Sequence, residues 1–183
     1  HPAMKAVAPI RTALGIRTLF NLVGPLANPA PLAFQLVGVS DPRLLRPMAE
    51  ALVRLGVRHG LVVRGHDGLD EATTTAATDL LEVRDGAITE RQLEPSSLGI
   101  PRGTLYDLRG GDPAQSALMA RAVLGGRRSA IHDIIALNAG CALYVADQAQ
   151  TIQEGVTRAG EILASGRARE LLDRVKGLSA DAG

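Results

Sequence analysis

The 183-residue sequence has a single cysteine, Cys141, no tryptophan and only 2% aromatic residues. One cysteine cannot form a disulfide within the chain, which is typical of a reducing compartment, so we expect a cytoplasmic location. The shortage of aromatic side chains argues against the stacking platforms of single-strand nucleic-acid binders. Because its neighbours are small and apolar, Cys141 is predicted to be a packed structural thiol.

An excess of one charge and a long apolar run are also missing. The net charge of +1 gives no general attraction to nucleic acid or to an anionic membrane, so neither is an expected partner. No run of about 18 apolar residues occurs, so no membrane span is predicted. The chain begins at His1 without the features of a signal peptide, and we interpret this as the start of a fragment.

The hydrophobic pattern predicts strands that alternate with helices. A strand over 34–39 is followed by a helix that Asp41 caps and Gly56 ends, and then by the apolar strand 61–63. A short strand without polar residues is typical of a parallel sheet that is buried on both faces. The order strand, helix, strand indicates a right-handed crossover.

The rest of the chain predicts a hairpin and then helices. Asp85-Gly86 is a standard turn pair between strands 80–83 and 88–93. The later helices are predicted from Pro113 onward, over 130–146, from Thr151 to about 166, and on to about 175. The fold class is therefore α/β, with a mostly parallel central sheet flanked by helices and one β-hairpin. We expect one domain over 1–176 and a frayed tail over 177–183.

Two adjacent carboxylates, Asp70 and Glu71, lie in the loop that leaves strand 61–63. Ligands of α/β sheets bind at the carboxyl ends of strands, which directs attention to this loop. Mg²⁺ takes carboxylate oxygens and water and often bridges to phosphates, so the pair is a candidate metal site. From spacing alone, a solvated acidic turn remains the more common explanation.

Arg11, Arg17 and His1 are further candidates. An arginine fork matches a carboxylate, so Arg11 or Arg17 could bind an acidic substrate, although a surface charge is the simpler explanation for each. His1 alone is uninformative. Gly110-Gly111-Asp112 is interpreted as a helix cap, and the sequence has no phosphate-loop, dinucleotide-binding or serine-hydrolase motif.

Taken together, several segments resemble the anthranilate phosphoribosyltransferases over nearly the whole chain, to about residue 175. The longest match lies at the start of the sequence, and the later matches follow in the same order. The matching segments are His1-Pro2-Ala3-Met4-Lys5, Ala8-Pro9-Ile10-Arg11, the run from Leu14 to Pro29, Gln35 to Val39 with Asp41-Pro42, Leu61 to Glu71, and Asn138 to Gly166.

This resemblance implies roles for individual residues. Arg11 would contact the carboxylate of anthranilate, while His1, Gly24 and Pro25 would line the anthranilate channel. Asp70 and Glu71 would hold a Mg²⁺ associated with the diphosphate of phosphoribosyl pyrophosphate. It also implies a fold of the nucleoside phosphorylase and phosphoribosyltransferase type, a homodimer for the complete enzyme, and no catalytic acid or base among these residues. Arg17 would be structural.

The sequence also departs from this family. The GTGGD loop, the KHGNR segment and the N-terminal helical domain, which grip the phosphoribosyl donor and form the dimer, are not found in these residues. We therefore expect the chain alone to be inactive or nearly so. Two alternatives stay open: a pyrimidine nucleoside phosphorylase, and a non-enzymatic nucleic-acid-binding relative. The pattern at Arg11 and 21–29 argues against the first, and the near-zero charge argues against the second.

Overall fold

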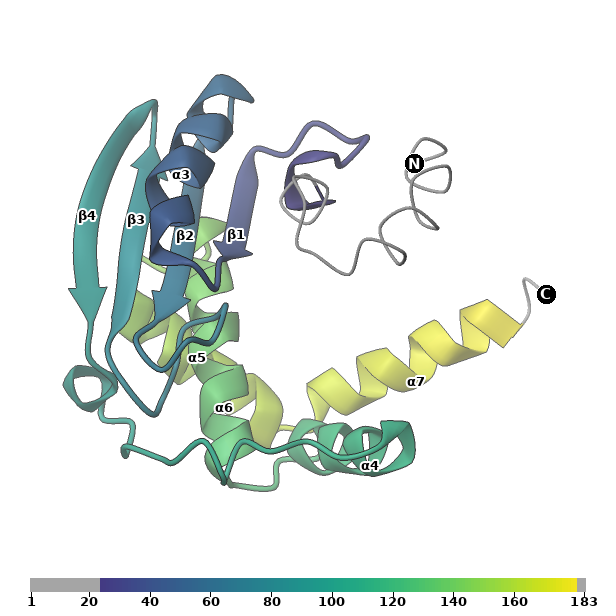
Figure 1. Cartoon of the computed structure of the whole chain (residues 1–183). Coiled ribbons are helices and arrows are strands. Elements are labelled where there is room, and N and C mark those ends of the chain that lie inside the picture. The colour runs from purple at the N-terminus through teal and green to yellow at the C-terminus, as the bar shows by residue number, and fades with distance from the viewer. Residues whose placement is uncertain (1–23, 181–183) are drawn as a thin grey trace, which may run out of the picture.

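The computed structural model describes residues 24–180, and a four-stranded sheet forms its centre (Figure 1). The strand order is β1-β2-β3-β4. β1 is parallel to β2, whereas β2 with β3 and β3 with β4 are antiparallel. The strands are β1 (Phe34–Gly38), β2 (His59–Gly65), β3 (Thr78–Arg84) and β4 (Ala87–Leu93).

Among the described strands the sheet is therefore mixed, and the prediction of a mostly parallel sheet was wrong. The connection over 66–77 contains no helix and returns the chain directly beside β2, so β3 runs in the opposite direction. The predicted hairpin is confirmed, because Asp85 and Gly86 have φ angles of 49° and 83°, as a tight turn between β3 and β4 requires.

The predicted crossover helix between β1 and β2 is present and covers one face of the sheet (Figure 1). It consists of the 3-10 turn η1 (Pro42–Leu44) and the helix α3 (Leu45–Arg54). The side chain of Asp41 accepts a hydrogen bond from the backbone N–H of Arg43 at 2.9 Å, which caps the first turn. One hydrophobic cluster joins this helix to the sheet through Met48, Leu52, Val62, Leu81 and Val83.

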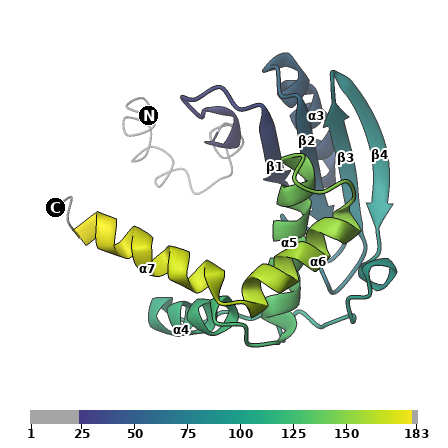
Figure 2. The same cartoon turned by 180° about the vertical axis from the view of Figure 1, so that it is seen from behind.

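Two packed helices, α5 (Ala130–Val145) and α6 (Ile152–Ala164), lie on the other face (Figure 2). α5 contacts the sheet and α6 covers α5. A side chain at Gly140 or Gly155 would collide with the backbone of the partner helix, so these two glycines permit the close approach. Cys141 is fully buried in the cluster between α5 and the sheet, which confirms the packed thiol.

The remaining helices, α4 (Pro113–Leu124) and α7 (Arg167–Ala180), project from this body, and the 3-10 turn η2 (Pro95–Leu98) follows β4. Asp112 forms a capping box with Gln115, as the helix-cap interpretation predicted. Helix α7 extends to Ala180, past the position where the tail was expected to begin, and 181–183 lie outside the described residues.

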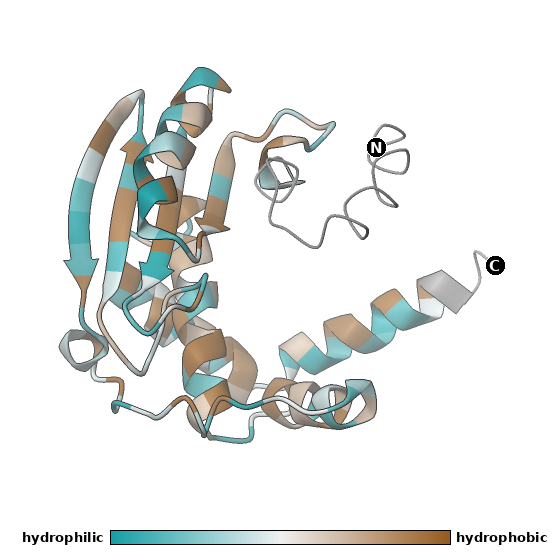
Figure 3. Ribbon diagram, viewed as in Figure 1, coloured by the Kyte–Doolittle hydropathy of each residue, from teal (hydrophilic) through white to brown (hydrophobic). Residues whose placement is uncertain are grey.

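Hydrophobic residues concentrate in β1, β2, β3 and α5, whereas α7 alternates hydrophobic and polar residues and the middle of β4 is polar (Figure 3). β4 is mostly exposed, as suits an edge strand that packs on one side only. Within residues 24–180, no helix is both long enough and apolar enough to cross a membrane.

Candidate functional site

Asp70 and Glu71 lie where β1 and β2 end. Gly38, the last residue of β1, packs against the backbone of Asp70 so closely that a Cβ at this position would overlap the carbonyl oxygen of Asp70. Asp70 is exposed and Glu71 is partly buried. The carboxyl ends of two neighbouring parallel strands thus present the acidic pair, which is the usual position of a ligand site in an α/β sheet.

A third carboxylate, Asp67, holds the loop in shape. It accepts hydrogen bonds from the backbone N–H of Leu69 at 3.1 Å, from the hydroxyl of Thr73 at 2.5 Å and from the hydroxyl of Thr75. Burial opposes ionisation of Asp67, but the hydrogen bonds from Thr73, Thr75 and Leu69 outweigh it and lower its pKa. Asp67 is therefore an ionised side chain that holds the loop in place, and each of its two oxygens already accepts a hydrogen bond.

The surroundings of Glu71 shift its pKa in the direction opposite to that of Asp67. Burial raises the pKa of its carboxyl, and the negative charges of Asp70 and Asp67 raise it further. One of its oxygens, Oε2, accepts a hydrogen bond from Nδ2 of Asn138 on α5 at 3.2 Å. A cation beside Glu71 would relieve this accumulation of like charge.

No such cation is supplied by the described part of the protein. None of the ion pairs formed within residues 24–180 involves Asp67, Asp70 or Glu71. Over the same range, no cluster of three or more His, Cys, Asp and Glu side chains has a metal-binding arrangement. Two carboxylates suit Mg²⁺, which keeps several waters and takes further oxygens from substrate phosphates, better than a metal that needs a complete protein cage.

Pro25 and Gly24, which were predicted to line a substrate channel, lie near the other end of β1. The carbonyl oxygen of Pro25 accepts a hydrogen bond from Nε2 of Gln35 at 2.6 Å. Pro25 lines a cavity of about 270 Å³ together with residues from Leu26 to Val57, and neither Asp70 nor Glu71 reaches it. Gly24 is exposed, and a Cβ there would meet no atom within 4 Å. His1, Arg11 and Arg17 lie outside the described residues.

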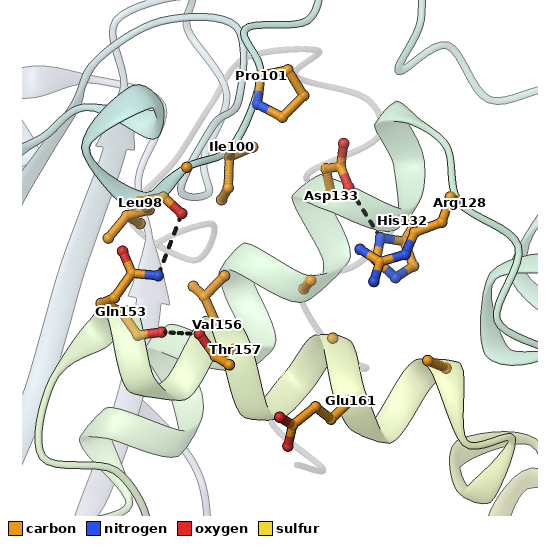
Figure 4. A pocket seen from close by; sticks show the side chains of 14 residues that line it. Leu98, Ile100, Pro101, Arg128, His132, Asp133, Gln153, Val156, Thr157 and Glu161 are labelled. Atoms are coloured by element: carbon orange, nitrogen blue, oxygen red, sulfur yellow. Dashed lines mark hydrogen bonds and ion pairs between the residues drawn. The ribbon is translucent and has the colours of Figure 1, made fainter.

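A larger cavity of about 370 Å³ lies between the segment after η2 and the helices α5 and α6 (Figure 4). His132 is buried in its wall, with Nδ1 at 3.0 Å from Oδ1 of Asp133. Arg128, Gln153 and Glu161 also line it. None of the predicted site residues lines it, so this cavity and the acidic loop are separate features.

The sequence reasoning missed Asn138. Asn138 is named there only as the first residue of a segment that resembles the family, yet its side chain contacts both Glu71 and Ala72. The available signal was an amide in the middle of an otherwise apolar stretch of helix, because a buried polar side chain needs partners. Only the fold shows that those partners belong to the acidic loop.

Three comparisons with known proteins bear on this arrangement. Residues 1–169 match the model of the "Glycosyl transferase family, a/b domain". An anthranilate phosphoribosyltransferase of Methylorubrum populi is 48% identical over 98% of this chain and 53% of its own length. The crystal structure of the Thermus thermophilus anthranilate phosphoribosyltransferase matches with a TM-score of 0.88 and 45% identity, over 95% of this chain and 51% of that one.

The anthranilate phosphoribosyltransferase of Saccharomyces cerevisiae, in complex with phosphoribosyl pyrophosphate and Mg, matches with a TM-score of 0.85 and 29% identity, over 94% of this chain and 50% of that one. This chain thus spans about half the length of the relatives that it matches. The family model covers most of the chain, and the chain therefore belongs to this glycosyl transferase family, as its α/β domain.

Proposed function

We propose that these residues form the acceptor and metal half of an anthranilate phosphoribosyltransferase. The complete enzyme would transfer the 5-phosphoribosyl group of phosphoribosyl pyrophosphate to the amine of anthranilate, with release of diphosphate, in tryptophan biosynthesis. The observation that carries the proposal is the acidic pair Asp70-Glu71, which has no cation partner within residues 24–180, in a chain 48% identical to an enzyme of that name. We further propose a cytoplasmic homodimer.

In this proposal the loop over 66–77 serves the departing diphosphate. A Mg²⁺ held by Asp70 and Glu71 would supply Lewis-acid stabilisation of the charge that grows on the leaving group. The hydrogen bonds to Asp67 hold the loop in place before substrate binds, so little reorganisation is needed during the reaction. The chemistry of the carboxylates fits this ion, because both supply hard oxygen donors.

The acceptor would be held by residues nearer the start of the chain. The guanidinium of Arg11 is proposed to bind the anthranilate carboxylate, and His1, Gly24 and Pro25 to line its channel. The amine then attacks the anomeric carbon of the ribose as the bond to diphosphate breaks. An aromatic amine needs no strong base for this attack, so positioning and electrostatics would supply most of the catalysis.

The test is a chimera in which residues 1–183 replace the matching half of the Thermus thermophilus enzyme. We expect phosphoribosyl transfer to anthranilate, measured as loss of anthranilate fluorescence. Uracil and thymidine phosphorolysis are assayed in parallel, and activity there without transfer would support the phosphorylase alternative instead. A chimera that unfolds cooperatively but performs no transfer would contradict the proposal. The chain alone is expected to be inactive or nearly so, and family-like turnover by it would refute that expectation.

Two variants of the chimera separate the roles. Replacing Asp70 by Asn and Glu71 by Gln should raise the Mg²⁺ concentration that gives half-maximal activity by about tenfold or more. Arg11→Ala should mainly raise the KM for anthranilate, by roughly 10- to 100-fold, because it removes a charged hydrogen bond. An unaltered metal titration would reject the metal role, and unchanged saturation by anthranilate would reject the role of Arg11.

A further inference from the structure

Asn138 lies in the third turn of α5, where that helix passes the loop between β2 and β3. Its side chain is partly buried; Oδ1 accepts one hydrogen bond, and the two hydrogens of Nδ2 are shared among three acceptors. Helix α5 is rigidly held between the sheet and α6, with Leu137 and Cys141 fully buried beside Asn138. A side chain on this helix can therefore fix the loop with little freedom of its own.

The amide binds the backbone on both sides of Ala72. Oδ1 of Asn138 accepts from the N–H of Ala72 at 3.0 Å, and Nδ2 donates to the carbonyl oxygen of Ala72 at 2.8 Å. Nδ2 also donates to the carbonyl oxygen of Ile134, within its own helix, at 3.0 Å. Because the N–H of Ala72 can only donate and its carbonyl can only accept, the orientation of the amide is determined.

The same Nδ2 also faces Oε2 of Glu71 at 3.2 Å. No other hydrogen bond to the side chain of Glu71 is formed within the described part of the chain, so Oε1 remains free there to face a cation. One amide thus holds the backbone that follows Glu71 and one oxygen of its carboxylate. We propose that Asn138 is a positioning residue that sets the orientation of the Glu71 carboxylate for the divalent cation.

This inference rests on the proposed metal role of Asp70 and Glu71, and a simpler role would be to attach the loop to the helix. The two roles differ in one measurable quantity. If Asn138 only attaches the loop, its removal lowers stability and changes metal affinity independently of Glu71. If it acts through Glu71, removal has no further effect on metal affinity once the Glu71 carboxylate is gone.

The experiment measures Mn²⁺ binding to the 183-residue chain by electron paramagnetic resonance, with Mn²⁺ as the probe for Mg²⁺. Variants are Asn138→Ala, Glu71→Gln and the double variant. We expect Asn138→Ala to weaken Mn²⁺ binding by about tenfold, as the loss of a residue that orients a metal ligand does. In the Glu71→Gln background, Asn138→Ala should change the affinity by less than about twofold.

Ile135→Ala is the matched control for loss of stability. Ile135 lies on α5 three residues earlier and packs in the cluster with α4 and α6 rather than on the acidic loop. It should lower the thermal midpoint while leaving Mn²⁺ affinity unchanged. Fully additive effects of Asn138→Ala and Glu71→Gln would overturn the positioning role alone. Wild-type binding that Asp70→Asn and Glu71→Gln do not weaken would instead overturn the metal site, and the inference with it.

Discussion

The two ends of β2 hold their charged side chains in opposite ways. At its first residue, His59 is buried, with Nε2 at 3.2 Å from Glu82 and Nδ1 at 3.2 Å from Asp147. Arg84 donates to the same Asp147 at 3.0 Å. Beyond its last residue, Asp67, Asp70 and Glu71 come together with no basic partner among the described residues.

Groups on β3, on β4 and on or just after α5 complete the network of hydrogen bonds and ion pairs at the first end of β2. The hydroxyl of Tyr144 on α5 donates to Glu82 at 2.6 Å, and Arg91 on β4 pairs with the other oxygen of Glu82 at 3.2 Å. Asp147, just after α5, also pairs with Arg58 at 3.0 Å. The buried carboxylate of Glu82 therefore has the guanidinium of Arg91 and the hydroxyl of Tyr144 as partners, as a buried charge in a stable fold requires.

The two ends of β2 differ in whether their charged side chains can stabilise the fold without a ligand. Charges that are matched within the chain can serve stability without any ligand, whereas like charges that are left unmatched cost stability until something binds. Burial and neighbouring charge raise the pKa of Glu71, while Asp147 has its pKa lowered by hydrogen bonds from His59, Arg58 and Arg84 that outweigh burial. The acidic loop is therefore the better candidate for a ligand site.

Breaking the matched end should have the largest effect. Glu82→Ala leaves His59 and Tyr144 without their shared buried acceptor, and an unsatisfied buried group costs about 1–3 kcal/mol, so we expect a loss of about 2–4 kcal/mol in the free energy of unfolding. Urea denaturation measures this loss. Mn²⁺ affinity at the other end should not change in the folded variant.

Glu90→Ala is the control for this prediction. Glu90 also lies in the sheet and pairs with Arg46, but both side chains are more than half exposed, at 64% and 51%. An exposed pair contributes only about 0–1 kcal/mol, so the control should cost far less than Glu82→Ala. Equal losses for the two variants would mean that the buried network does not stabilise the fold.

The local parts of this fold could be predicted from the sequence. The cap at Asp41, the turn at Asp85-Gly86 and the cap at Thr151 each depend on a few neighbouring residues, and all three are present. The antiparallel direction of β3 could not be predicted, because an apolar run such as 61–63, although typical of a parallel sheet, can also lie beside an antiparallel strand. The loop over 66–77 decides it.

The same limit applies to the site. Asp70 and Glu71 were candidates from the sequence because adjacent carboxylates after a buried strand can bind Mg²⁺, but only the resemblance to the family implied that role, which stays a prediction. Asn138 was missed because its partner Ala72 lies 66 positions away, and the pairing of Tyr144 with Glu82 spans 62 positions. Contacts of this kind exist only after the strands and helices have packed. Arg11 and His1 stay predictions, since they lie outside the described residues.

A second variant tests whether Gly38 places the acidic pair. Gly38→Ala would drive a methyl group into the carbonyl oxygen of Asp70, so the loop must move. Overpacking of this kind costs about 1–3 kcal/mol, and we also expect weaker Mn²⁺ binding. Gly160→Ala on α6 is the control, because a Cβ there meets no atom within 4 Å and should stabilise the helix by about 0.5–1 kcal/mol. Normal metal affinity in Gly38→Ala would show that the loop tolerates displacement.

We expect the smallest effects in the pH dependence of stability. The contributions of the charged groups at the two ends of β2 should change in opposite directions as the pH falls. The pKa of Asp147 is lowered in the folded state, so its contribution is present at neutral pH and is lost as the pH falls through that pKa. Asp147→Asn should thus be less stable than the wild type at neutral pH, and the difference should shrink in acid. Asparagine adopts the positive φ of 55° at this position as readily as aspartate, so the substitution should not add backbone strain.

Glu71 should behave in the opposite way, because its pKa is raised in the folded state. Folding then favours the protonated carboxyl, so the wild type gains stability as the pH falls through the Glu71 pKa. Without divalent cations, Glu71→Gln should be more stable than the wild type at neutral pH, and this advantage should vanish below the ordinary glutamate pKa of 4.5. Urea midpoints between about pH 3 and pH 8 measure both variants. A contrary result would be that the two variants change their stability difference from the wild type in the same direction as the pH falls. In that case the two ends of β2 are electrostatically alike, and the unmatched charge of the acidic loop no longer argues for a ligand site.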